Sequence, residues 1–302
     1  MGIFSANKSL QDRIFLGVSV VVLIFVLGII FALFGGLINQ GLDRLNWDFM
    51  FSFPSRNPQK AGIYSAWVGS ILVILVTAIC SVIIGVITGL YLEEYAPKNW
   101  MTQIIELAIA NMAGVPSITF GLLALSFFVI RLDFGESILT AGLTLTLLVL
   151  PIIIVATRES LRSIPLSIRE AVYSLGASRY QVIRDHLLPY SLHGILTGVI
   201  LAISRAIGET APLIAIGALT FIAFLPQPPL EEQFPFVNFD WLFDNFTVLP
   251  IQMYNWISRP QEKFHVNAAA TGIVLLIITT LLNLMAQIIR FYFRKKYSRQ
   301  SF

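Results

Sequence analysis

Six long apolar stretches decide what this chain can fold into. A bilayer core about 30 Å thick takes about 20 helical residues to cross. The stretches that meet this length are residues 14–37, 66–92, 107–130, 137–157, 191 to about 225, and 266–289, and only the fifth contains charged residues. With 56% hydrophobic residues and a mean hydropathy of +0.79, the chain holds more apolar side chain than a soluble fold of 302 residues can bury. The sequence therefore predicts an all-α polytopic membrane protein with six transmembrane helices.

The first stretch is expected to remain as a helix, because its apolar run exceeds 20 residues and no small-residue cleavage site follows it. The predicted organisation has three parts: an N-terminal helix with an outer loop (1–65), a transmembrane domain (66–290) and a basic cytoplasmic tail (291–302). A single cysteine, Cys80, excludes a disulfide or a cysteine metal site within one chain.

The placement of charges predicts the orientation, because short loops rich in Lys and Arg stay in the cytoplasm. With the N-terminus inside, the cytoplasmic segments hold thirteen basic residues: Lys8, Arg13, Lys98, Arg158, Arg162, Arg169, Arg179, Arg184, Arg290, Arg294, Lys295, Lys296 and Arg299. The outer segments hold six basic and nine acidic residues: Arg44, Arg56, Lys60, Arg131, Arg259, Lys263, Asp43, Asp48, Asp133, Glu136, Glu231, Glu232, Asp240, Asp244 and Glu262. We therefore expect both termini in the cytoplasm and the basic tail at lipid headgroups, with no nucleic-acid role.

Prolines interrupt three of the apolar stretches, and each removes one helical hydrogen bond that lipid cannot replace. Pro116, Pro151 and Pro212 are expected to free the carbonyls of Met112, Leu147 and Gly208, and so to kink helices that face the bundle interior. The outer segments 39–65 and 226–263 are rich in proline and are expected to be irregular.

The segment 158–189, between the fourth and fifth stretches, is too long for a simple hairpin and too apolar for a solvated linker. Apolar residues recur in it at helical spacing, at Ile168, Ala171, Val172, Leu175 and Ala177. We expect a short amphipathic helix, a turn at Gly176 and a second helical stretch ending near Pro189, docked on another surface. Taken singly, Glu170 and Gly176 also fit a solvated helix charge and an ordinary helix C-cap.

This segment resembles the EAA loop of ATP-binding-cassette importer permeases, in which EAA, three residues, glycine and nine residues precede I-x-L-P. The matching residues are Glu170-Ala171-Val172, Gly176 and His186-Leu187-Leu188-Pro189, with valine for the second alanine and histidine for isoleucine. The resemblance covers about residues 66–289 and implies the type I ABC importer permease fold. It also implies that Glu170, Ala171, Gly176 and Pro189 belong to a coupling loop seated in a groove of a separate ATPase.

A second motif places two charges within the fifth stretch. Arg205 and Glu209 lie four residues apart and so share a helix face. Because a charge near the bilayer centre costs roughly 2.5–3.5 kcal/mol on insertion scales, the pair is expected to face a cavity. The Arg205 guanidinium offers a planar fork of donors to a tetrahedral oxyanion, and Gly208 lets a ligand approach the backbone. An ion pair that only neutralises itself during insertion is the alternative.

The surrounding run resembles the fifth-span motif of phosphate importer permeases of the PstA type. It reads Ser204-Arg205-Ala206-Ile207-Gly208-Glu209-Thr210-Ala211-Pro212-Leu213. The predicted substrate pathway is Arg205, Gly208, Glu209 and Thr210. Glu209 either holds Arg205 in place or accepts a hydrogen bond from a protonated oxygen of phosphate, which would repel sulfate.

The resemblances imply a permease subunit of a phosphate importer in the inner (plasma) membrane, with no cofactor and no catalytic residue of its own. The expected partners are a second homologous permease, a dimer of the cassette ATPase, an extracytoplasmic phosphate-binding protein, inorganic phosphate and membrane lipid. The chain contains no G-x-x-x-x-G-K-[ST] run, so ATP must be hydrolysed by the partner. The first alternative is a permease for sulfate or molybdate. A secondary transporter or channel is a less favoured alternative. A membrane-embedded enzyme is disfavoured, since neither G-x-S-x-G nor H-E-x-x-H occurs.

Overall fold

A computed structural model of the chain describes residues 10–218, 221–228 and 238–298. Within these ranges the chain is helical, and its only β contact is an isolated bridge between Ser137 and Asn245. The predicted all-α class is therefore confirmed. Four residues of the charge count, Lys8, Glu231, Glu232 and Arg299, lie outside the described residues.

Long apolar helices account for most of the described chain. Five are long and apolar enough to cross a bilayer, and they cover Asp12–Arg44, Tyr64–Tyr95, Ile138–Arg162, Arg179–Gly208 and Glu262–Tyr292. A sixth span is formed only if the pair Trp100–Met112 and Ser117–Arg131, bent by 110°, counts as one. The prediction of six spans thus holds with one span broken in the middle.

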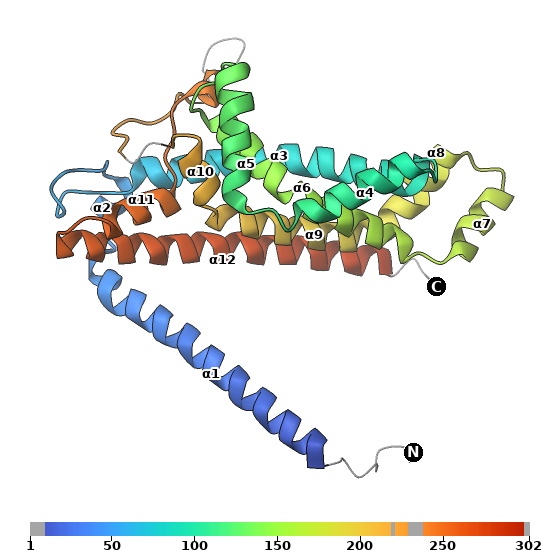
Figure 1. The fold of residues 1–302 in the computed structure, drawn as a ribbon, viewed down its shortest axis with the longest axis horizontal. Helices are drawn as coiled ribbons and strands as arrows, with labels where there is room; N and C mark the ends of the chain where they lie inside the picture. The colour runs from blue at the N-terminus through green and yellow to red at the C-terminus, as the bar shows by residue number, and fades with distance from the viewer. Residues whose placement is uncertain (1–9, 219–220, 229–237, 299–302) are drawn as a thin grey trace.

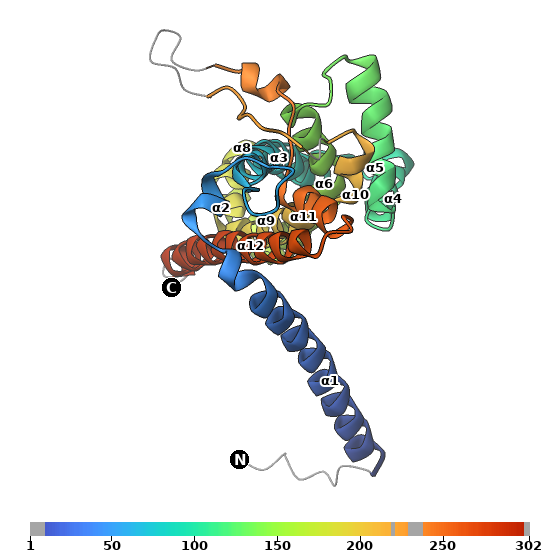
Figure 2. The ribbon, with the colours of Figure 1, turned by 90° about the vertical axis from the view of Figure 1, so that its left-hand side faces the viewer.

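Four helices form the bundle: α3 (Tyr64–Leu90), α6 (Ile138–Arg162), α9 (Leu188–Gly208) and α12 (Glu262–Ser298). They run along the long axis in Figure 1 and are seen nearly end-on in Figure 2. Helix α1 (Leu10–Gly41) projects away from the bundle in both views, and most of the apolar side chains described on it are exposed.

Glycines let the bundle helices approach closely. A Cβ added at Gly85 of α3 would lie 2.7 Å from Ile153 Cγ2 of α6, and one at Gly89 would lie 2.7 Å from Thr157 Cβ. Since the two glycines are four residues apart, they form one small-residue strip on α3 into which α6 packs. Residues Leu145, Val149 and Ile153 of α6 are buried in the largest apolar core.

The three interior prolines have three different outcomes. Pro116 precedes α5 (Ser117–Ala124) and follows α4 (Trp100–Met112), so the third apolar stretch turns sharply and is not one kinked helix. Pro151 lies buried inside an unbroken α6. Pro212 stands in the first turn of a new helix, α10 (Ala211–Ala215), where its missing N–H costs nothing. The expectation that Pro212 kinks a continuing helix was wrong.

The outer segments contain more regular structure than their prolines suggested. They include η1 (Leu42–Arg44), α2 (Trp47–Phe51), η5 (Asp240–Phe243) and α11 (Leu249–Ile257). Helix α11 begins with Pro250 in its first turn and buries Trp256 against Phe49 and Phe264. Proline here starts a helix, so the prediction of irregular structure was wrong for this part.

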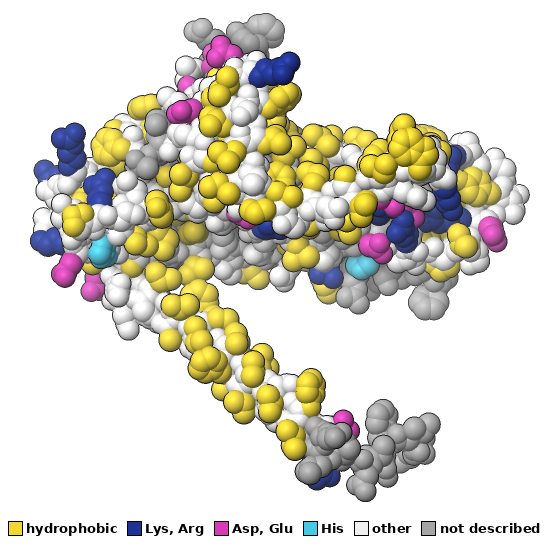
Figure 3. Space-filling model, in the orientation of Figure 1, with side chains coloured by type: hydrophobic (Ala, Val, Ile, Leu, Met, Phe, Trp, Pro, Cys, Tyr) yellow, Lys and Arg dark blue, Asp and Glu magenta, His cyan; other side chains and the backbone are white. Residues whose placement is uncertain are grey.

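The two ends of the bundle differ. One end, called here the coupling-loop end, holds α7 (Leu166–Ser174) and α8 (Arg179–Gln181), and the opposite end holds α2 and α11 (Figure 1). Figure 3 shows Lys and Arg side chains gathered at both ends, with hydrophobic side chains along α1 and the middle of the visible face. This distribution is that of a protein whose middle lies in lipid.

Candidate functional site

The predicted pathway residues lie where α9 ends. Helix α9 stops at Gly208, Glu209 caps it in an extended conformation with φ −75° and ψ 128°, and α10 begins at Ala211. The fifth apolar stretch is therefore a helix, a break and a short second helix, and not the single helix to about residue 225 that was expected. A broken helix within a membrane protein exposes backbone groups that only a cavity or neighbouring protein can satisfy.

Arg205 and Glu209 form the expected ion pair. Arg205 Nε lies 3.3 Å from Glu209 Oε1, and the side chains are 40% and 18% exposed. Ala202 and Ala206 of α9 are buried in the bundle, whereas Arg205 is exposed, as is Leu201 one turn earlier. Its position on the last turn also lets the guanidinium offset the partial negative charge of the helix C-terminus.

An open cavity of about 530 Å³ lies beside this break. Its lining comes from α5, the end of α9, the break after it, α10, α11 and α12: Ile118, Gly208, Thr210, Ala211, Ile214, Pro250, Met253, Tyr254, Ile257 and Leu275. Gly208 and Thr210, two of the four predicted pathway residues, thus line the cavity, while Arg205 and Glu209 do not. A Cβ added at Gly208 would meet nothing within 4 Å, which leaves the backbone open to a ligand.

The wall of this site is held by close packing between α5 and α10. A Cβ added at Gly121 of α5 would lie 2.7 Å from the Ala215 Cβ of α10. On the other side, the Ser204 hydroxyl donates to the Ile200 carbonyl at 2.7 Å and also contacts Asn283 Oδ1 of α12. Asn283 was not singled out from the sequence, although a lone amide in an apolar stretch is a signal of interhelical contact.

The coupling loop has the predicted first half. Helix α7 contains Glu170 and Ala171, both exposed, and Gly176 follows with φ +82°, a conformation that favours glycine. The second half differs: α8 runs through a π turn, η4 (Val182–Leu187), directly into α9. Pro189 therefore stands in the first turn of α9, and does not end a helix, because the first turn tolerates its missing N–H.

The apolar residues of α7 and of the turn that follows it differ in their surroundings. Ile168, Val172 and Ala177 pack on an apolar cluster of this chain made by Leu161, Ile164, Val182, Ile183 and Leu187. Leu166 and Leu175 are instead 72% and 87% exposed and touch no core of this chain. Helix α7 is thus packed on the bundle through Ile168 and Val172, while the leucines at its two ends are exposed.

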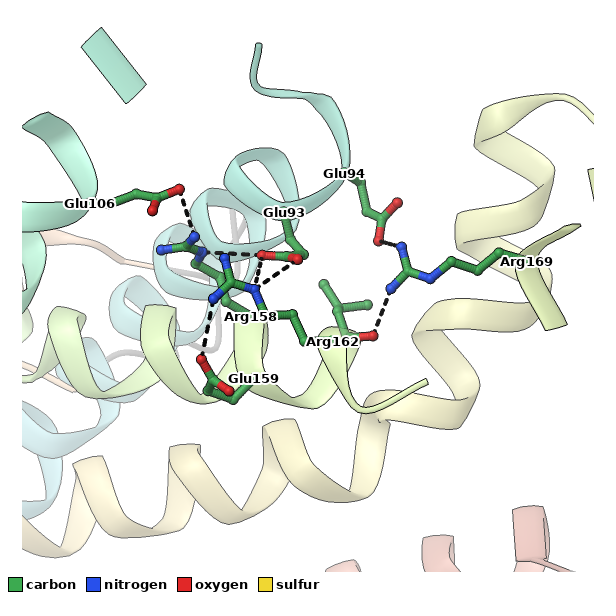
Figure 4. Close-up of polar contacts among 8 residues, drawn as sticks. Glu93, Glu94, Glu106, Arg158, Glu159, Arg162 and Arg169 are labelled. Carbon is green, nitrogen blue, oxygen red and sulfur yellow. Dashed lines mark hydrogen bonds and ion pairs between the residues drawn. The ribbon is translucent and has the colours of Figure 1, made fainter. Parts of the chain in front are cut away.

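A cluster of ion pairs at the coupling-loop end was not found from the sequence (Figure 4). Helix α3 continues into a π turn, η2 (Tyr91–Tyr95), which carries Glu93 and Glu94. Glu93 Oε2 lies 2.9 Å from Arg162 Nε and 3.4 Å from Arg158 Nε, and Glu94 Oε1 lies 2.5 Å from Arg169 Nη1 of α7. The sequence signal that could have indicated this cluster is a pair of adjacent acidic residues, Glu93 and Glu94, next to segments that are otherwise rich in Lys and Arg.

In the described part of the chain, no group of three or more His, Cys, Asp or Glu side chains is placed to hold a metal ion. The two candidate sites are the Arg205–Glu209 ion pair near the cavity and the helix α7 at the end of the bundle.

Comparisons with known proteins place this geometry in context. Residues 81–299 match the family model described as "Binding-protein-dependent transport system inner membrane component". A phosphate transport system permease protein PstA from Yersinia pestis is 30% identical over 282 residues, which cover 92% of this chain and 90% of that protein. PstA 1 from Mycobacterium tuberculosis is 30% identical over 76% of this chain and 71% of its own length. The probable ABC transporter permease YqgI from Bacillus subtilis is also 30% identical, over 76% and 79%.

The solved structures agree on the fold. An inward-facing conformation of the MetNI methionine ABC transporter has a chain with a TM-score of 0.57 and 18% identity to this one, covering 74% of this chain and 93% of that chain. This similarity supports the predicted type I importer permease fold and says nothing of the substrate.

Proposed function

Because the chain belongs to the family of inner-membrane components of binding-protein-dependent transport systems, we propose that it is a permease subunit of an ATP-driven phosphate importer. It forms half of the translocation pathway and couples to a separate ATPase through the loop that contains α7. It is a multi-pass protein of the inner membrane, with both termini in the cytoplasm. It needs no cofactor of its own, since ATP is hydrolysed by the partner subunit.

The observation that carries the proposal is the Arg205–Glu209 pair at the C-terminal end of α9. A pathway between two permeases must be lined by residues that a single chain leaves exposed, and the Arg205 side chain is 40% exposed. Beside it, Gly208 and Thr210 face an open cavity. A guanidinium with an open backbone next to it suits a tetrahedral oxyanion.

Phosphate is favoured over sulfate and molybdate for two reasons. The relatives that span most of the chain include phosphate transport permeases of the PstA type. In addition, Glu209 supplies a carboxylate beside the cation, and phosphate near neutral pH still carries a proton that a carboxylate can accept in a hydrogen bond. A fully ionised sulfate would meet only repulsion from that carboxylate.

The proposed partners follow from the two open surfaces. A second, homologous permease covers the exposed side of α9, and an ATPase dimer receives α7 with the exposed leucines at its two ends, Leu166 and Leu175. A phosphate-binding protein delivers the substrate at the opposite end, which holds α2 and α11. The assignment of Glu170, Ala171, Gly176 and Pro189 to the coupling loop remains a prediction.

Uptake by the whole transporter tests the substrate. We expect the complex of both permeases, the ATPase and the phosphate-binding protein, reconstituted in vesicles, to accumulate radiolabelled phosphate only with ATP. A large excess of sulfate or molybdate should leave the rate unchanged. Uptake of sulfate or molybdate at a rate equal to or above that of phosphate would contradict the assignment and favour the other oxyanion.

The orientation gives a second prediction, because α3 has an exposed lysine beyond each end. Lys60 precedes the helix and Lys98 follows η2. In a chain with Cys80 replaced by Ser, Lys60→Cys should react with an impermeant maleimide in intact spheroplasts, and Lys98→Cys only after permeabilisation. The two variants serve as each other's control, and the reverse pattern would show that the coupling-loop end lies outside.

A further inference from the structure

The end of α3 presents two adjacent carboxylates to two different parts of the molecule. Glu93 points to α6, where it pairs with Arg158 and Arg162. Glu94 points to α7, where its Oε1 lies 2.5 Å from Arg169 Nη1 (Figure 4). Both stand on the π turn η2, and such turns are frequent at functional positions in helices.

The contact between Glu94 and the coupling loop is largely buried. The side chain of Glu94 is 7% exposed and that of Arg169 is 17% exposed. Arg169 also donates through Nη2 to the Leu161 carbonyl at 2.7 Å. Removing one partner of such a pair leaves an uncompensated charge away from water, so the pair holds its geometry.

A second arginine of the loop binds the same turn. The guanidinium of Arg179, in α8, donates to the backbone carbonyl of Glu94 and lies 4.9 Å from the centre of the Tyr95 ring. The helices on both sides of Gly176 are therefore attached to η2. Among the described residues, α3 contributes only Leu90 to the apolar cluster on which α7 packs. The connection between α3 and the segment of α7 and α8 is therefore mainly polar.

The other carboxylate extends the connection into the membrane. Arg158, which pairs with Glu93, is also 2.6 Å from Glu106 of α4. The chain of charges thus joins α7, α3, α6 and α4 at one end of the bundle. Helix α4 leads directly to the sharp turn at Pro116 and to α5, which packs on α10 beside the cavity.

We infer that Glu93 and Glu94 form a two-sided joint: Glu94 holds the coupling helix through Arg169, and Glu93 passes its displacement to α6 and α4. The inference rests on the proposed coupling of α7 to an ATPase. A joint of this kind needs a rigid link on each side, and the ion pairs on either side of η2 provide them. These residues position the coupling helix and touch neither substrate nor nucleotide.

The decisive experiment compares Glu94→Gln, Arg169→Gln and the double variant in the whole reconstituted transporter. The single variants each leave one buried charge unpaired, while the double variant leaves none, so it should assemble normally. We expect the double variant to copurify with the ATPase and to hydrolyse ATP within about twofold of wild type, while substrate transported per ATP falls by about tenfold, a typical coupling factor. Lys98→Gln, an exposed cation four residues from Glu94, is the matched control and should transport normally.

Three outcomes would overturn the joint: an unchanged ratio of transport to ATP hydrolysis in the double variant, a loss of ATPase binding in step with transport, or a double variant much worse than either single one. An unchanged ratio would show that the pair has no role in coupling. A parallel loss of ATPase binding and transport would show that the pair only supports assembly, and a much worse double variant would show that the two residues act separately. The ratio is measured with whichever oxyanion the wild-type complex transports. A wrong substrate assignment therefore shows in the wild type, and a wrong joint shows only in the variants.

Discussion

Leu175→Asp is expected to abolish phosphate uptake while leaving the amount of this chain in the membrane unchanged. Leu175 is 87% exposed at the C-terminal cap of α7 and contacts no core of its own chain, so folding does not depend on it. In the assembled transporter the same side chain would be buried in the groove of the ATPase. Central apolar contacts of this kind are worth about 2 kcal/mol or more, about thirtyfold in affinity, and a buried carboxylate adds a desolvation cost.

Copurification of the ATPase with this chain and vesicle uptake measure the effect. Leu175→Met keeps the apolar contact and should behave as wild type. Ile168→Asp provides the contrasting case, since Ile168 packs on the apolar cluster of this chain, and it should lower the membrane level of the chain itself. Normal ATPase binding by Leu175→Asp would show that Leu175 is not part of the docking surface.

The different burial of the apolar residues in and after α7 shows what helical periodicity can and cannot predict. The spacing of Ile168, Val172 and Leu175 predicted an amphipathic helix, and the structure confirms that helix together with the left-handed turn at Gly176. Periodicity gives one apolar face and cannot say that Ile168 and Val172 cover the bundle while Leu175 faces away. That difference depends on where η4 and the end of α6 lie, which is a tertiary property.

The prolines give a second example, since the sequence does not predict whether a proline ends, interrupts or begins a helix. Pro116, Pro151 and Pro212 each lie inside an apolar stretch. At Pro116 the chain turns by 110°, at Pro151 the helix continues unbroken, and at Pro212 a new helix begins. The residue type fixes only the missing N–H and the φ angle. Whether the helix continues depends on which group can donate a hydrogen bond to the freed carbonyl, and the sequence does not specify that donor.

Ion pairs between distant segments could not be predicted from the sequence, because they too depend on tertiary structure. Glu94 and Arg169 are 75 residues apart, and nothing local marks them as partners. The Arg205–Glu209 pair was predictable because its members are four residues apart on one turn, and the structure confirms the contact.

Replacing Arg205 and Glu209 by glutamine, singly and together, separates the transport role of this pair from a structural one. Arg205→Gln removes the charged fork, and hydrogen bonds to a charged group are worth about 1.5–3 kcal/mol, so phosphate uptake should fall about ten- to hundredfold. The chain should still insert, because a neutral side chain crosses the membrane more easily than a charged one. Uptake and membrane abundance are measured on the same vesicles.

Glu209→Gln keeps the shape of the side chain and removes its charge. If the carboxylate accepts a hydrogen bond from the proton of phosphate, this variant should lose phosphate uptake and be inhibited by sulfate, which the carboxylate no longer repels. If Glu209 only pairs with Arg205, the variant should be less abundant, since a partly buried guanidinium loses its partner. Sulfate competition and abundance thus report on different roles.

The double variant decides between these two roles. A structural pair predicts that Arg205→Gln with Glu209→Gln is more abundant than Glu209→Gln alone, because no unpaired charge remains. A substrate pair predicts that the double variant reaches the membrane at the wild-type level and still fails to transport. Leu201, one turn before Arg205 on the same exposed side of α9, gives the matched control: Leu201→Val should transport normally. Full phosphate transport by the double variant would show that neither residue handles the anion, and the pathway would then have to be sought among the residues that line the cavity.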